Sequence, residues 1–185
     1  MKRTFIAIKV SLSREVAELF ADIKLQLKDE RIKWVDLGNL HITLYFIGDV
    51  HDEFLKQLEE FLMLELSSFQ SFKMNISKVG VFKNLKDPRA IWFGLEENKN
   101  LRQLKQLINK ALDLCGMNTK DKKFKPHITL GRIKSLKNKL LLKKIMEENA
   151  ERQIQQFLVK EIILYESQLT QQGAVYKVLR KIELR

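Results

Sequence analysis

The tetrapeptide His-Ile-Thr-Leu occurs twice in this chain, at residues 41–44 and at residues 127–130. In an extended strand successive side chains point to opposite faces, so the histidine and threonine of each copy share one face while the isoleucine and leucine share the other. Each copy is therefore predicted to form a strand that buries its apolar face and presents an imidazole and a hydroxyl to a cleft. Any fold for this chain has to accommodate two such strands.

The two copies take up two of the three histidines in the chain, His41 and His127. A single histidine in an apolar strand is more often structural than catalytic. A duplicated strand can also arise without catalysis, but then only the apolar positions would be expected to match. Because imidazole titrates near neutral pH, two facing rings can hold one proton between them, one as base and the other as acid. The repeat, with Thr43 and Thr129 on the same faces, predicts the active site of an acid–base enzyme.

The composition is that of an ordinary globular protein, with 45% apolar and 31% charged residues in a chain of 185. The apolar runs are too short to span a bilayer. The first segment, residues 1–9, reaches Lys9 after four apolar positions, which is too few for a secretory signal and indicates a strand. The net charge of +11 indicates either a polyanionic partner or a well-solvated basic surface, and charge alone does not decide between them.

The one cysteine, Cys115, has no partner for an intrachain disulfide. It ends an apolar helical pattern and is expected to be a small core residue. An isolated cysteine favours a reducing compartment, so we expect a cytoplasmic protein. We also expect a monomer with no membrane partner.

The same order of elements recurs in the two halves of the chain. Apolar residues at helical spacing predict helices over residues 13–30, with Ser13 as the cap, and over residues 52–65, 101–115 and 136–148. Strands are predicted at the two motifs and over residues 72–82, 90–95, 157–166 and 174–184. Each half thus has the order helix, histidine strand, helix, strand, strand, and no linker rich in Pro, Gly or Ser divides the two halves.

We predict an α+β fold in a single domain, residues 1–185, with two interleaved pseudo-symmetric lobes. Each lobe is an antiparallel sheet with helices on the outside, and the central cleft between them carries both motifs.

Around the motifs the sequence resembles a known family. Residues 39–44 followed by Phe46 and Gly48, together with Phe-Lys-Pro-His-Ile-Thr-Leu-Gly-Arg at residues 124–132, are similar to the 2H phosphoesterases. Within them the chain most resembles the RNA 2′,3′-cyclic phosphodiesterases of bacteria and archaea, also described as 2′-5′ RNA ligase-like proteins. The resemblance also includes residues 5–8, residues 33–35, and residues 164–167 with Tyr176. The two histidine motifs at this spacing are highly specific, whereas these other segments are weak alone.

The resemblance implies the opening of a 2′,3′-cyclic phosphate at an RNA or nucleotide end, without metal or cofactor. His127 would be the proton acceptor that activates water, and His41 the proton donor to the leaving 3′ oxygen, giving a 2′-phosphomonoester. The residues alone leave this assignment open, because the pseudo-symmetry permits the opposite one. Thr43 and Thr129 could donate hydrogen bonds to phosphoryl oxygens as charge builds up on them.

Two further residues are candidates for substrate binding, Arg132 and Phe124. Strict alternation would turn Arg132 away from His127, but a bulge near Gly131 could direct it to the phosphate; otherwise it is a solvated arginine at a strand end. Phe124 could stack a base beside a lysine cluster that holds the RNA backbone, or it could anchor a charged loop to the core. The lysines of that cluster are Lys122, Lys123 and Lys125.

Other interpretations remain open at this stage. Another 2H activity, on a cyclic nucleotide or ADP-ribose derivative or in 2′-5′ RNA ligation, would use the same core, and a non-catalytic RNA-binding module could share the fold. The sequence has no His-Glu-x-x-His zinc motif, no Gly-x-Ser-x-Gly elbow, no phosphate loop and no dinucleotide fingerprint. His51 lies in a turn before a helix and is expected at the surface.

Overall fold

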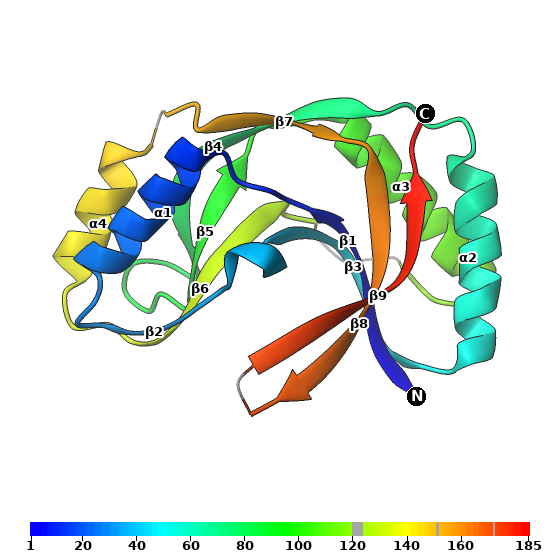
Figure 1. Ribbon diagram of the computed structural model, residues 1–185, viewed down its shortest axis with the longest axis horizontal. Helices are drawn as coiled ribbons and strands as arrows, with labels where there is room; N and C mark the ends of the chain where they lie inside the picture. The colour runs from blue at the N-terminus through cyan, green and yellow to red at the C-terminus, as the bar shows by residue number, and fades with distance from the viewer. Residues whose placement is uncertain (120–123, 151, 172) are drawn as a thin grey trace.

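An antiparallel sheet that curls through the whole molecule is the main feature of the fold (Figure 1). The computed structural model describes residues 1–119, 124–150, 152–171 and 173–185. Their strands are β1 (Lys2–Lys9), β2 (Arg31–Trp34), β3 (His41–Val50), β4 (Phe72–Phe82), β5 (Ala90–Leu95), β6 (His127–Ser135), β7 (Gln155–Val159), β8 (Glu161–Thr170) and β9 (Gly173–Glu183). The predicted strands at both motifs, at residues 72–82 and at residues 90–95 are confirmed.

The helices form at the predicted places, but the first ends at Gln26 and not at residue 30. They are α1 (Arg14–Gln26), α2 (Asp52–Leu66), α3 (Lys99–Leu114) and α4 (Lys139–Glu148), with a 3₁₀ turn, η1, at Leu37–Asn39. The Ser13 side chain accepts a hydrogen bond from the Val16 N–H, which confirms the predicted cap. α4 begins later than predicted because Asn138 caps it, its side chain accepting from the Leu141 N–H.

The strand order has an internal two-fold pattern. The order is β7-β4-β5-β6-β3-β1-β8-β9, and β2 pairs with β6 at the side. The two halves of this order are equivalent when counted outward from the centre: β6 corresponds to β3, β5 to β1, β4 to β8 and β7 to β9. The registers repeat as well. Leu44 is left unpaired in the β1–β3 ladder and Leu130 in the β5–β6 ladder, so a bulge follows each motif at the same place.

Each lobe takes elements from both halves of the chain. Figure 1 shows α1 and α4 on the side of the molecule that holds β4 and β5, while α2 and α3 pack together on the side of β8 and β9. The α+β class, the antiparallel sheets and the outer helices are confirmed. The pairing of β3 with β6 joins the two lobes in one nine-stranded sheet, with β7-β4-β5-β6 and β2 on one side and β3-β1-β8-β9 on the other.

The apolar core lies mainly between the sheet and the helices. Ile6 and Ile8 of β1 belong to this large cluster, whereas Phe5 and Ala7 belong to a smaller one with Ile163 and residues of β8 and β9. Because alternate residues of a strand point to opposite faces, the small cluster lies on the other face of the sheet. That face carries the histidines.

One predicted strand was wrong in extent. Residues 157–166 do not form a continuous strand, because Lys160 lies outside strand geometry and separates β7 from β8. β7 pairs with β4 and β8 pairs with β1, which belong to different lobes. The chain therefore has to bend where it passes from one lobe to the other, and local sequence pattern does not mark that point.

Candidate active site

The two His-Ile-Thr-Leu segments lie next to each other in the joined sheet. β3 and β6 pair antiparallel at Ile42 and Ile128, both fully buried. One step along this register, His41 lies beside Thr129 and Thr43 lies beside His127, all four on the same partly exposed face. The predicted division of faces is therefore confirmed. The two imidazoles occupy one diagonal of this group and the two hydroxyls occupy the other.

Each imidazole is anchored in the same way. The Nδ1 atom of His41 lies 2.7 Å from the Asn39 carbonyl oxygen, and that of His127 lies 2.8 Å from the Lys125 carbonyl oxygen. A carbonyl oxygen can only accept, so Nδ1 carries the hydrogen in both rings. Nε2 is therefore an acceptor in the neutral ring and a donor in the protonated ring, the two states that proton transfer requires.

Aromatic side chains pack against both rings. His41 lies between Phe5 and Tyr176, with ring centroids 5.2 Å away in each case. His127 meets the edge of Phe82, with the centroids 4.5 Å apart. These contacts, together with the Nδ1 hydrogen bonds, limit ring rotation.

Both histidine pKa values lie below their ordinary range. For His41 burial is the main cause, the Asn39 carbonyl opposes it, and the positive charges of His127 and Arg132 lower the pKa further. For His127 burial again lowers the pKa, the Lys125 carbonyl opposes it, and Arg132 adds to the lowering. In the free protein at neutral pH the two rings are therefore largely neutral, and an anion bound between them would raise both pKa values.

The cleft around His41 is strongly cationic. It is a pocket of about 410 Å³ whose lining includes His41, Thr43 and Tyr176. Among the residues that line it, none is acidic and four are basic: Arg3, Lys33, Arg132 and Lys134. A low-dielectric wall with charges of one sign attracts an anionic ligand.

Arg132 lies on the same side as the histidines. The unpaired Leu130 shifts the strand by one residue, so Leu130 is buried while Arg132 is exposed in the cleft beside His41 and Thr43. The conditional prediction of a bulge near Gly131 is thus confirmed. At the matching position after the first motif, Phe46 lines the same cleft.

The other predicted residues lie in different surroundings. Phe124 is partly buried against the large core cluster, with the Lys105 ammonium 5.8 Å from its ring centroid, and its role in substrate binding stays a prediction. Lys122 and Lys123 lie outside the described residues, and Lys125 is exposed. His51 is exposed at the start of α2, as predicted. Cys115 is half-buried against the core, where burial raises the pKa of its thiol.

Several residues of the cleft were not singled out as candidates by sequence reasoning. Lys134 lies two positions after Arg132 on β6, so alternation could have placed it on the same face once the bulge was known. Arg3 comes from β1, and its guanidinium lies 5.0 Å from the centroid of the Phe46 ring. Only the pairing of β1 with β3 brings them together, so no local signal was available.

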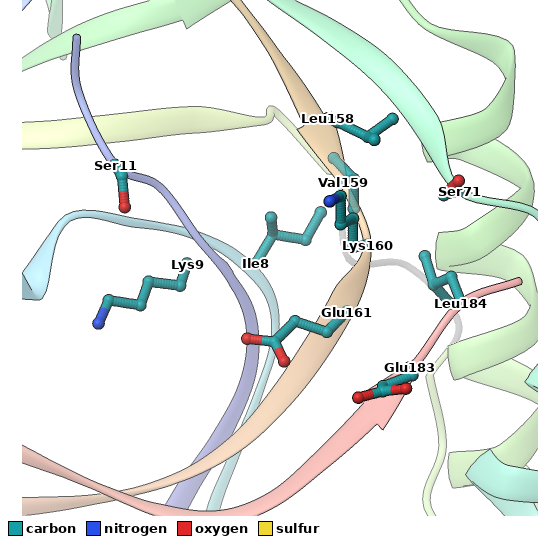
Figure 2. A pocket seen from close by; sticks show the side chains of 10 residues that line it. All are labelled: Ile8, Lys9, Ser11, Ser71, Leu158, Val159, Lys160, Glu161, Glu183 and Leu184. Carbon is teal, nitrogen blue, oxygen red and sulfur yellow. The ribbon is translucent and has the colours of Figure 1, made fainter.

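A second pocket, of about 500 Å³, lies at the bend between β7 and β8 (Figure 2). Lys9, Glu161 and Glu183 are among the residues that carry its charges. Glu161 also pairs with Lys181 of β9 at 3.4 Å, which links its carboxylate to the β8–β9 ladder. This pocket contains neither histidine motif. In the described part of the chain, no group of three or more His, Cys, Asp or Glu residues is arranged to hold a metal ion.

Comparison with known proteins agrees with the geometry. A family model described as LigT-like phosphoesterase matches residues 6–92 and residues 94–176. The chain belongs to the LigT-like phosphoesterase family. Each matched segment of this family contains one histidine motif, in line with the two-fold pattern of the sheet.

Named relatives cover nearly the whole chain. The RNA 2′,3′-cyclic phosphodiesterase of Methanocaldococcus jannaschii is 36% identical over 97% of this chain and 99% of that protein. The protein of the same name from Archaeoglobus fulgidus is 35% identical over 98% and 99%. A solved structure from Thermus thermophilus has a TM-score of 0.78 at 25% identity, covering 99% of this chain and 98% of that one. E. coli LigT in apo form has a TM-score of 0.75 at 23% identity over 99% and 97%, which shows the common fold.

Proposed function

We propose that this LigT-like phosphoesterase hydrolyses RNA 2′,3′-cyclic phosphate ends to 2′-phosphomonoesters. The observation that carries the proposal is the pair of His-x-Thr strands, which lie side by side with both imidazoles anchored through Nδ1. One of the two, His41, lines the cationic cleft. Relatives named RNA 2′,3′-cyclic phosphodiesterase, such as that of Methanocaldococcus jannaschii, support the choice of substrate.

In the proposed step, the Nε2 atom of His127 takes a proton from water while that water attacks phosphorus. A bond forms between phosphorus and the water oxygen, the bond to the 3′ oxygen breaks, and the protonated Nε2 of His41 gives its proton to that oxygen. Attack and departure occur on opposite sides of phosphorus, which suits two imidazoles on a diagonal. The assignment of acid and base follows the family resemblance. The cycle closes when a proton returns from His127 to His41 through solvent.

The charge that develops on the phosphoryl oxygens needs donors that are already oriented. Thr43 and Thr129 are proposed to donate hydrogen bonds to these oxygens from the same face as the histidines, and Arg132 is proposed to hold the phosphate by charge. The phosphate in turn raises the histidine pKa values, so substrate binding promotes the protonation that His41 needs as the acid.

We propose that the step requires no metal and no cofactor, since two imidazoles supply both proton transfers and the cationic side chains supply the electrostatic stabilisation. The partner is an RNA or nucleotide with a cyclic phosphate end. No helix in the described part of the chain is long and apolar enough to cross a membrane. A cytoplasmic location is proposed on the strength of the isolated Cys115. A monomer is proposed as well.

The test is hydrolysis of a short RNA that ends in a 2′,3′-cyclic phosphate, in the presence of EDTA, with His41→Ala and His127→Ala as separate variants. Each proton transfer is worth about 10² to 10⁴ in rate, so each variant should lose most turnover. Because both histidines act in one step, the double variant should be little worse than either single one. Near-normal turnover in either folded variant, or loss of wild-type activity in EDTA with recovery on adding a divalent ion, would contradict the proposal.

A further inference from the structure

Two large aromatic side chains next to His127 are not explained by core packing. Phe82 of β4 and Trp92 of β5 are both partly exposed, and neither is part of the two apolar clusters formed by the described residues. Trp92 pairs across the ladder with Thr129, so it shares the cleft face with the catalytic motif. Phe82 packs against Trp92 at 5.5 Å and against His127 at 4.5 Å between ring centroids.

The sheet is shaped to hold the Trp92 indole flat. Gly80 lies opposite Trp92 on β4, and a Cβ atom there would overlap three atoms of the six-membered ring. Gly94 lies two residues along β5, and a Cβ atom there would come 2.9 Å from Lys78 Cγ and 3.0 Å from the same ring, so the Lys78 side chain shares this space with the indole. The indole thus rests on the bare backbone of Gly80 and occupies the space that a side chain at Gly80 would fill.

The two-fold pattern of the sheet allows the positions of Trp92 and Phe82 to be compared with their equivalents in the other lobe. The sheet positions equivalent to Trp92 and Phe82 in the other lobe are Ala7 and Tyr165. There the aromatic residues near His41 are closed into the small apolar cluster, with Phe5 3% exposed and Tyr165 7% exposed. Partly exposed aromatic rings also lie near His41, because Phe46 and Tyr176 line its pocket, but neither occupies the sheet position equivalent to Phe82 or Trp92.

Trp92 also carries an unsatisfied polar atom. Its Nε1 is buried without a hydrogen-bond partner among the described residues. A buried unpaired N–H is unfavourable, and a leucine or phenylalanine would avoid that cost. An indole at this position is accounted for if its wide π face binds a ligand.

We propose that Trp92 and Phe82 form the platform on which the nucleobase of the reacting nucleotide stacks. This inference rests on the proposed function, because the phosphate of that nucleotide lies between the two histidines. Phe82 touches the His127 ring, so a nucleotide whose phosphate meets His127 has its sugar and base directed over Phe82 and Trp92. Stacking uses the face of the base, so the site accepts all four bases and binds purines more tightly than pyrimidines.

The test compares Trp92→Leu, which removes the π face, with Trp92→Phe, which keeps one. Binding of 2′-AMP and of inorganic phosphate is measured by calorimetry for both variants and the wild type. Trp92→Leu is expected to weaken 2′-AMP about tenfold, within the range for one stacked base, and to leave phosphate affinity unchanged. Trp92→Phe should restore most of the 2′-AMP affinity. Equal weakening of phosphate and 2′-AMP in Trp92→Leu, or no weakening of either, overturns the platform.

A second measurement does not depend on how well Trp92→Leu folds. The chain has two tryptophans, so Trp92 is the only indole in a Trp34→Phe variant. Its fluorescence should be quenched by 2′-AMP and unaffected by inorganic phosphate; a signal indifferent to 2′-AMP overturns the platform.

Failure of the platform and failure of the proposed function give different results. If wild-type protein hydrolyses the cyclic phosphate but Trp92→Leu keeps the wild-type KM, the platform alone is wrong. If wild-type protein does not hydrolyse the cyclic phosphate yet 2′-AMP still quenches Trp92 fluorescence, the proposed platform is supported and the proposed reaction is wrong.

Discussion

Arg132 combines two effects in one side chain. Its guanidinium lowers the pKa of both histidines in the free protein, and it is also the proposed partner of the substrate phosphate. The two effects oppose each other in the catalytic cycle, since the first keeps the histidines neutral and the second brings in the anion that allows protonation. The variants Arg132→Gln and Arg132→Lys distinguish the effect on the histidine pKa values from the binding of phosphate.

Arg132→Gln should raise the pKa of both histidines and move the optimum of kcat/KM to higher pH. It should also lower kcat/KM about 10- to 100-fold, the effect of losing a hydrogen bond to a charged group. Arg132→Lys keeps the charge, so it should keep the wild-type optimum and lose only part of the rate. The measurement is the pH–rate profile of the three proteins. An unchanged optimum in the glutamine variant would show that Arg132 does not act on the histidines.

The threonines can be tested by removing only their hydroxyls. Thr43→Val and Thr129→Val keep the β-branched shape and the strand preference, so Tm should barely change. If each hydroxyl stabilises charge on the phosphoryl oxygens, its loss should raise the barrier by about 2 to 4 kcal/mol. Product affinity should fall less than turnover, because the donor acts most strongly in the transition state. Turnover that falls only in step with Tm would make the threonines structural.

At the scale of elements, the bulge after the second motif directs Arg132 into the cleft. Gly131 follows the unpaired Leu130 and lies under β2, where an added Cβ would come 2.7 Å from Ile32 Cγ2 and 2.8 Å from Trp34 Cε3. The bulge is thus held by close packing of β2 on β6. The position of Arg132 depends on a contact between two strands that are remote in sequence.

Gly131→Ala should therefore lower both stability and activity. Overpacking of this kind costs about 1 to 3 kcal/mol, which is several degrees in Tm for a chain of this size. kcat/KM should fall as well, because Arg132 moves with the bulge. The matched control for stability is Gly38→Ala, since Gly38 has nothing within 4 Å of an added Cβ. Wild-type Tm and activity in Gly131→Ala would show that β2 can move aside without disturbing Arg132.

At the scale of the whole molecule, the histidine pKa values couple folding to pH. In the folded protein both lie below the values of the unfolded chain, so near pH 6 the unfolded chain binds more protons. The stabilisation is present above the unfolded pKa of about 6.5 and is lost as the pH falls toward the folded values. Burial and positive charge in the cleft therefore make the stability of the whole protein depend on pH.

The double variant His41→Asn, His127→Asn should have a flatter dependence of Tm on pH than the wild type between about pH 7.5 and pH 5.5, the range around the unfolded histidine pKa. Asparagine keeps a donor near the Nδ1 position but does not titrate. The control is His51→Gln, whose side chain is exposed outside the cleft and which should follow the wild type. Melting curves in a buffer without phosphate measure this, and equal slopes for the wild type and the double variant would show that the histidines do not contribute.

The sequence by itself determined the local parts of this protein. Alternation placed Ile42 and Ile128 in the core and the histidines and threonines on the opposite face, because a strand has a period of two. Apolar spacing located the helices, since burying one face of a helix needs a stripe of period 3.6. The family resemblance indicated the chemistry, because histidine and threonine at matching positions in two strands are an unusual coincidence.

Tertiary structure decided what depends on contacts between remote segments. The bulge at Leu130 turned Arg132 into the cleft, and the pairing of β1 with β3 brought Arg3 to Phe46. The strand is interrupted at Lys160 because β7 and β8, which are consecutive in the chain, pair with strands of different lobes. Burial and the charge of Arg132 lowered the histidine pKa values. The sequence raised the bulge near Gly131 only as one of two alternatives. The other features have no local signal, because register, burial and electrostatic field are properties of the assembled sheet and not of any one segment.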